Sequence, residues 1–252
     1  MQKQVIINNV LINYYVDEKN STASIIFLHG WRSNSAVWQP LINKIKDLRF
    51  KIYEIDLPGF GMSETPKKPF TLDDYANVIK SFIDLRFKIQ DSRIIVVGHS
   101  FGARVATKLA ATHPKLIQKL VLVDAGGARP KGRKVKQFLA KLARPFFTPS
   151  FMQPLRKKIY QKMGAEDYIA TPELKQTFLN VINEDLAPLF PKIAAPTLIV
   201  WGENDTETPI SYAHMMHTAI PHSQLAILPN AGHFSFLDQP EKFINALTKF
   251  II

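Results

Sequence analysis

A serine flanked by two glycines, at residues 98–102, has the sequence context of a nucleophile. Residues 98–102 read Gly-His-Ser-Phe-Gly, after the apolar run 93–97 and before a segment with helical periodicity. In a strand–turn–helix setting, the pattern G-x-S-x-G holds the serine on a tight turn that leaves no room for flanking side chains. The helix behind the turn directs N–H groups at developing negative charge. The spacing therefore predicts Ser100 as a nucleophile.

His233 has the position of a base for this hydroxyl. A serine is a weak nucleophile until a base takes its proton. His233 lies in a loop with Gly232, directly after the last strand-like run, and catalytic groups of open parallel sheets gather at such strand ends. The other histidines are interpreted as surface residues (His113, His214, His217, His222) or as parts of local structure (His29, His99).

An acid must orient the base, and Asp205 is the carboxylate expected to do so. It follows the apolar run 197–201, and the order Ser100, Asp205, His233 is one in which such groups occur with G-x-S-x-G. The sequence leaves three rivals, in the same loop or at the end of another strand-like run: Glu203, Glu207 and Asp124.

Two backbone N–H groups are predicted to form an oxyanion hole. One belongs to Phe101, directly after the nucleophile, and the other to Trp31, in the sequence His-Gly-Trp that follows the run 25–28. Gly30 lets the backbone approach closely, and each donor typically contributes about 3 kcal/mol of transition-state stabilisation. Trp31 has a second interpretation as an aromatic residue that lines the pocket, and both are compatible.

The turn at 56–61, Asp-Leu-Pro-Gly-Phe-Gly, is interpreted as structural. Its glycines supply positive φ angles, and Asp56 is expected to hold the turn in place. A phosphate-binding loop is a weaker interpretation, because the G-x-G-x-x-G pattern that it needs is absent.

Alternating strand-like and helix-like segments must position these residues. Continuous apolar runs are typical of parallel strands buried on both faces, and helices between them imply right-handed crossovers. The sequence predicts an α/β fold with a mostly parallel sheet of about eight strands flanked by helices. The predicted strands are 5–7, 11–16, 25–28, 51–55, 93–97, 119–123, 197–201 and 224–228, the first two joined through Asn8-Asn9. The predicted helices are 72–87, 102–112, 211–219 and 241–250.

Residues 126–191 break the alternation and contain no convincing strand. Apolar residues at helical spacing predict helices around 135–142 and 152–163, and a third over 171–183 that has a proline in its first turn. We interpret the segment as a helical cap inserted into a core made of residues 1–125 and 192–252.

Together, these motifs resemble the α/β-hydrolase superfamily, in particular its small capped esterases, lactonases, carbon–carbon-bond hydrolases and cofactor-free haloperoxidase-like members. The resemblance covers the chain apart from the cap and rests on 29–31, 56–61, 98–102, 202–205 and 232–233. It implies the α/β-hydrolase fold and a Ser-His-Asp triad. Haloalkane dehalogenases and epoxide hydrolases have an aspartate where this chain has Ser100, so they are set aside. The fold hosts many activities and does not choose the substrate.

The reaction implied is two-step acyl transfer by a carboxylesterase acting on small or medium acyl chains, with no metal or organic cofactor. Two alternatives remain: a lactonase or C–C-bond hydrolase with the same triad, and a small-molecule receptor or signalling partner with little turnover. In this resemblance the cap covers the pocket, although its apolar residues are equally explained by packing. The pocket candidates are His29, Phe138, Leu139, Phe146, Phe147, Phe151, Met152 and Phe234.

The composition of the 252 residues narrows the classes further. The absence of cysteine excludes disulfides, thiolate metal sites and cysteine nucleophiles. Neither a signal peptide nor an apolar run of spanning length is visible, so a cytoplasmic protein is expected. The net charge of +11 is concentrated in 129–162, which holds eleven Lys and Arg and no acid, unlike a uniformly basic nucleic-acid binder. This segment is interpreted as a solvated helix face, an attractor of anionic substrates or a weak contact to an anionic membrane surface. The oligomeric state is left open.

Overall fold

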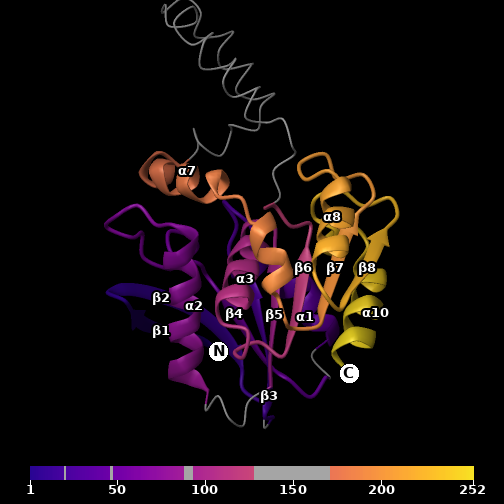
Figure 1. Cartoon of the computed structure of the whole chain (residues 1–252). Coiled ribbons are helices and arrows are strands. Elements are labelled where there is room, and N and C mark those ends of the chain that lie inside the picture. The colour runs from indigo at the N-terminus through magenta and orange to yellow at the C-terminus, as the bar shows by residue number, and fades with distance from the viewer. Residues whose placement is uncertain (20, 46–47, 88–92, 128–170) are drawn as a thin grey trace, which may run out of the picture.

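One sheet of eight strands runs through the protein, in the order β1-β2-β4-β3-β5-β6-β7-β8 (Figure 1). β2 pairs antiparallel with both β1 and β4, whereas all other neighbouring strands are parallel. The mostly parallel sheet predicted from the sequence is therefore confirmed. The computed structural model describes residues 1–19, 21–45, 48–87, 93–127 and 171–252.

The strands follow the predicted runs to within a few residues. Their bounds are Gln2–Ile7 (β1), Val10–Asp17 (β2), Ala23–Leu28 (β3), Lys51–Ile55 (β4), Arg93–His99 (β5), Lys119–Val123 (β6), Thr197–Gly202 (β7) and Ser223–Leu228 (β8).

The local sequence accounts for the hairpin between β1 and β2 and for the burial of the central strand β3. Asn8 and Asn9 have φ angles of 50° and 62°, which the two central residues of a tight hairpin turn require, so β1 and β2 form the predicted hairpin. Every residue of β3 is buried. Its side chains alternate between the two faces, and each face packs into a separate apolar core.

Helices cover both faces of the sheet (Figure 1). One core includes residues of α2 (Leu72–Arg86), α3 (Phe101–Thr112) and α8 (Ser211–Ala219). The other includes residues of α1 (Gln39–Ile45), α9 (Ser235–Asp238) and α10 (Pro240–Ile251). Within the described ranges, no helix has the length and the apolar character needed to cross a membrane.

The structure contains short helices that the sequence pattern does not predict. They are α1, α9 and the 3₁₀ helices Ser35–Trp38 (η1) and Ala187–Lys192 (η6), whose few turns leave little periodicity in the sequence. The helix expected over 171–183 is confirmed as a 3₁₀ turn, Pro172–Leu174 (η5), followed by α7, Lys175–Asn183.

The middle of the proposed cap lies outside the described residues. The structure describes only 126–127 and 171–191 of that segment, so the helices expected around 135–142 and 152–163 stay predictions. The basic segment 129–162 lies outside the described residues as well.

Backbone packs directly on backbone where β5 passes into α3. A Cβ atom at Gly102 would lie 2.2 Å from the carbonyl oxygen of Leu28 and 2.7 Å from that of His29. Both distances are far below van der Waals contact, and neither neighbour is a side chain that can move aside. Glycine at this position therefore allows α3 to approach the end of β3.

We expect Gly102→Ala to lower the free energy of unfolding by at least about 2 kcal/mol, because the added methyl group overpacks a contact between two backbones. Gly126→Ala is the matched control, since the nearest atom to its added Cβ would be Cδ of Arg104 at 3.5 Å. Chemical denaturation of both variants measures the difference. Equal stability of the two variants would contradict the packing argument.

Candidate active site

Ser100 lies on the turn between β5 and α3 in a conformation that few non-glycine residues adopt. Its φ and ψ angles are 49° and −106°. Strain of this kind persists only where the surroundings impose it. Here the backbone N–H of Ser100 donates to the carbonyl oxygen of Val123 at 2.9 Å, on the neighbouring strand β6. Ser100 thus lies between the carboxyl end of β5 and the first residue of α3.

The structure brings Ser100, His233 and Asp205 together, although 133 residues separate the first two. His233 Nε2 lies 3.0 Å from Ser100 Oγ, and His233 Nδ1 lies 2.9 Å from Oδ2 of Asp205. A carboxylate can only accept, so the proton of the neutral ring is on Nδ1, and Nε2 accepts from the serine hydroxyl. This is the tautomer that a base for Ser100 needs.

Asp205 is held as an ionised acceptor by its own loop. Its Oδ1 accepts from the backbone N–H groups of Glu207 and Thr208 at 2.8 and 2.9 Å, and its Oδ2 accepts from Thr208 Oγ1 at 2.6 Å. Burial raises the pKa of Asp205, but the hydrogen bonds from His233 and Thr208 outweigh it and leave the pKa below its ordinary value.

His233 shows the reciprocal effect. Burial lowers the pKa of His233, but its hydrogen bond to Asp205 and the charge of that carboxylate raise it by more, so the pKa lies above its ordinary value of 6.5. The arrangement therefore favours a positive charge on the imidazole, which is what a base needs at the moment it takes a proton.

The three rival carboxylates have other positions. Asp124 is fully buried and accepts from the backbone N–H of Gly202 at 2.8 Å and from Oγ of Ser235 at 2.6 Å. Burial raises the pKa of Asp124 to about 7. Glu203 accepts from a loop N–H, and the exposed Glu207 lies 3.5 Å from Nε2 of His233, on the side away from Nδ1. Asp205 is thus the carboxylate that bonds to Nδ1.

The peptide between Gly30 and Trp31 is oriented by His29. Nε2 of His29 accepts from the backbone N–H of Leu57 at 3.0 Å, so the ring proton is on Nδ1, which donates to the carbonyl oxygen of Gly30 at 2.7 Å. In a planar trans peptide the N–H of Trp31 points the opposite way from that carbonyl. Gly30 lies against Ser100, since a Cβ atom at Gly30 would be 3.5 Å from Cβ of Ser100.

His29 stays neutral in this position. It is fully buried, and burial lowers its pKa to about 4. It was predicted from sequence both as part of local structure and as a pocket candidate, and the structure places its ring among backbone groups. The second expected donor, the N–H of Phe101, belongs to the first residue of α3, where the helix itself provides no acceptor.

Of the other pocket candidates, Phe234 is 39% exposed, and its ring centroid lies 5.8 Å from that of His233. The remaining candidates lie outside the described residues: Phe138, Leu139, Phe146, Phe147, Phe151 and Met152.

Two residues of the site were not assigned a role in it from sequence. Oγ1 of Thr208 donates a hydrogen bond to Oδ2 of Asp205. A Thr three residues after an Asp in a turn is the sequence signal that suggests this bond. His99 is almost fully buried and donates from Nε2 to the carbonyl oxygen of His233 at 2.7 Å. It thereby links the turn of Ser100 to the loop of His233, and burial lowers the pKa of His99 to about 3.

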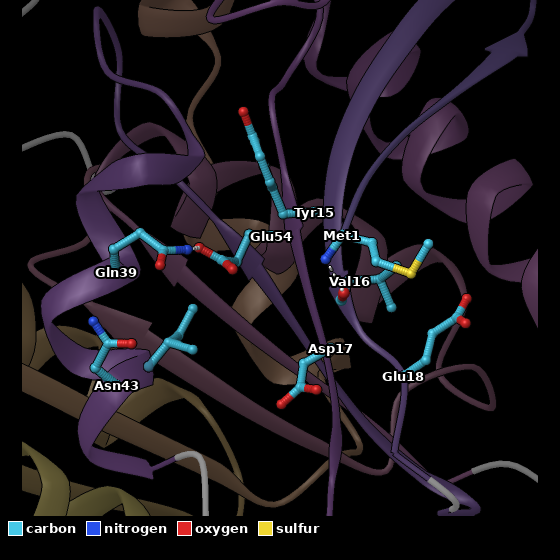
Figure 2. A pocket seen from close by; sticks show the side chains of 9 residues that line it. Met1, Tyr15, Val16, Asp17, Glu18, Gln39, Asn43 and Glu54 are labelled. Atoms are coloured by element: carbon cyan, nitrogen blue, oxygen red, sulfur yellow. Dashed lines mark hydrogen bonds between the residues drawn. The ribbon is translucent and has the colours of Figure 1, made fainter.

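A separate pocket lies between β2, β4 and α1 (Figure 2). Its deepest carboxylate belongs to Glu54, which accepts from Nε2 of Gln39 at 2.5 Å and whose pKa burial raises to about 7. Asp17 and Glu18, also at this pocket, form ion pairs with lysines. None of the residues that line it belongs to the group around Ser100.

Comparison with known proteins places the chain in a family. The sequence model described as "Alpha/beta hydrolase family" matches residues 25–246. Pimeloyl-[acyl-carrier protein] methyl ester esterase of Nitrosomonas europaea is 27% identical over 93% of this chain and 98% of that protein. 2-(Acetamidomethylene)succinate hydrolase of Mesorhizobium japonicum is 28% identical over 100% of this chain and 95% of that protein.

A solved structure described as a membrane phospholipase A and bacterial virulence factor has the same fold. It superposes with a TM-score of 0.79 at 23% identity, covering 100% of this chain and 85% of that chain. The fold expected from the sequence motifs is therefore confirmed, and the family model spans most of the residues that build it. The chain belongs to the alpha/beta hydrolase family.

Proposed function

We propose that the protein is a serine hydrolase that cleaves carboxylic esters of small or medium acyl chains through Ser100, His233 and Asp205. The observation that carries this proposal is the unbroken line of hydrogen bonds from Ser100 Oγ to Nε2 of His233, at 3.0 Å, and from its Nδ1 to Asp205, at 2.9 Å. Such a line lets a base activate a hydroxyl while an acid holds its orientation.

The proposed reaction has two steps. His233 takes the proton of Ser100 as Oγ attacks the ester carbonyl, and the N–H groups of Trp31 and Phe101 donate to the resulting oxyanion. The imidazolium, stabilised by Asp205, gives its proton to the leaving alkoxide. His233 then activates a water that releases the acid from the acyl-enzyme.

The names of the relatives support hydrolysis and leave the bond open. One relative is named as a methyl ester esterase, which favours an ester substrate. Another is named for a succinate derivative. A substrate panel must therefore include p-nitrophenyl esters of graded chain length, lactones and a vinylogous diketone.

We expect Ser100→Ala to abolish ester hydrolysis and labelling by a fluorophosphonate, because no other hydroxyl contacts Nε2 of His233 within the described residues. Hydrolysis of the panel and mass spectrometry of the labelled protein measure both effects, with circular dichroism to show that the variant is folded. A folded Ser100→Ala variant that is still labelled would refute the assignment of the nucleophile.

We expect Asp205→Asn to lower kcat by roughly 10³–10⁴-fold and to move the acid limb of the kcat/KM profile to lower pH. The base acts only when neutral, so activity falls as pH drops through the pKa of His233, which Asp205 raises in the wild type. Without that charge, burial lowers the pKa, and the neutral base persists at lower pH.

Asp124→Asn is the control for this prediction. It removes an acceptor for Ser235 and should reduce stability more than activity. The midpoint of the acid limb should move less than in Asp205→Asn, because Asp124 contributes least among the groups that raise the pKa of His233. If Asp124→Asn shifted the limb and Asp205→Asn did not, the roles of the two carboxylates would have to be exchanged.

Two substitutions of His29 separate its two hydrogen bonds. Asn offers an N–H near the position of Nδ1, towards Gly30, whereas Gln offers an oxygen near the position of Nε2, towards Leu57. We expect His29→Gln to lower kcat by about 10- to 100-fold with little change in KM, because the Gly30–Trp31 peptide loses its orientation. His29→Asn should retain more of kcat. Equal losses of kcat in both variants would contradict the orienting role of the hydrogen bond from Nδ1 to Gly30.

A further inference from the structure

α7 is fixed to the hydrolase core at its side and at its carboxyl end, at the top of the view in Figure 1. Oγ1 of Thr177 accepts from the backbone N–H of Phe70 at 3.0 Å, and Nδ2 of Asn180 donates to the carbonyl oxygen of Phe70 at 3.1 Å. The helix is therefore attached to the loop before α2, and its position is defined by the core.

A buried arginine holds the carboxyl end of α7. Nη2 of Arg104, on α3, donates to the carbonyl oxygens of Val181 and Glu184, at 2.6 Å each. The last carbonyls of a helix have no partner within the helix and carry partial negative charge, so a cation there both donates to them and offsets their charge. Arg104 is only 8% exposed, and the proposed reaction does not use it.

A second cation strengthens the same junction. Nζ of Lys108, one turn after Arg104 on α3, lies 2.7 Å from a carboxylate oxygen of Glu184 and 2.9 Å from one of Asp73. Three helices thus meet at this point, and α3, which begins at the proposed nucleophile, carries both cations.

Phe178 connects this anchored helix to the site. It lies one turn before Val181, is 7% exposed, and its ring centroid is 5.1 Å from that of Trp31. The ring of Trp31 also contacts Phe60 and Phe101, at centroid distances of 4.8 and 5.1 Å. The four rings form a continuous aromatic wall that includes Phe101, the residue directly after Ser100.

We propose that Phe178 is a specificity-determining residue for the acyl group of the substrate, and that Arg104 is the positioning residue that holds it against Trp31. This inference rests on the proposed function, because the N–H of Trp31 must hold the carbonyl oxygen of the ester. In that arrangement the indole ring of Trp31, which Phe178 contacts, flanks the acyl chain attached to the carbonyl carbon.

The first test changes the size of the wall. With p-nitrophenol as the constant leaving group, kcat/KM is measured for the acetate and the octanoate, and their ratio depends on the acyl side. We expect Phe178→Ala to raise the octanoate-to-acetate ratio of kcat/KM about tenfold, because the smaller side chain leaves more room for a long acyl chain. We expect Phe178→Trp to lower this ratio, because the larger side chain leaves less room. Phe250→Ala, at a phenylalanine of α10 that is also 7% exposed, should leave the ratio unchanged.

The second test separates positioning by Arg104 from a general effect on stability. Arg104→Met removes the donors at similar length, and Arg104→Lys keeps a cation. We expect the Met variant to shift the ratio in the direction of Phe178→Ala and the Lys variant to restore part of it. Trp38 and Trp201 are fully buried, so increased quenching of tryptophan fluorescence by acrylamide in the Met variant would report that Trp31 has lost its cover.

The outcomes are distinguishable. If the wild type cleaves no ester in the panel and Ser100 is not labelled, the proposed function fails, and this inference fails with it. If the wild type is active but the ratio is the same in the Phe178 variants, the wall does not select the acyl group and only this inference is overturned. A ratio that follows Phe178 but not Arg104, with unchanged quenching, overturns the positioning role of Arg104.

Discussion

Contact between backbones at the carboxyl end of β5 is the constraint on which the rest of the site depends. A Cβ at Gly98 would lie 2.5 Å from the carbonyl oxygen of Gly102, and one at Gly102 would lie 2.2 Å from that of Leu28. This close packing leaves Ser100 a φ angle of 49° and holds it beside the Gly30–Trp31 peptide. The same contact fixes where α3 begins, and therefore where Phe101 presents its N–H and where Arg104 meets α7.

The two buried carboxylates near the site, Asp124 and Asp205, have different hydrogen-bond partners, and their pKa values shift in opposite directions. Asp124 accepts from Gly202 and Ser235, so it joins the end of β7 to the start of α9, and burial raises its pKa to about 7. Asp205 accepts from its own turn and from His233, and these bonds keep its pKa low despite burial. In our proposal only Asp205 acts in the reaction, because only its carboxylate bonds to Nδ1.

Buried histidines fix the two loops that face the serine. Burial lowers the pKa of His29 to about 4 and that of His99 to about 3, so both remain neutral, with one ring nitrogen as donor. His29 donates to Gly30, and His99 donates to the carbonyl of His233. A buried imidazole whose pKa lies well below neutrality keeps its protonation state near pH 7, so both bonds persist while His233 titrates.

The sequence by itself determined the order of the strands along the chain, the turn at Ser100 and the residues that follow each strand. These features depend on local chemistry: continuous apolar runs, glycines where backbones touch, and polar groups at strand ends. It ranked Asp205 above Asp124 but left both open, because two carboxylates after two neighbouring strands look alike until their partners are known. Only the tertiary structure decided that Nδ1 of His233 meets Asp205, that His29 bonds to the backbone of both Gly30 and Leu57, and that Arg104 bonds to the end of α7 while Phe178 contacts Trp31. The contacts from Asp205 to His233, from Leu57 to His29 and from Arg104 to Val181 join segments distant in sequence, at distances that the packing of the whole sheet sets and local periodicity does not encode.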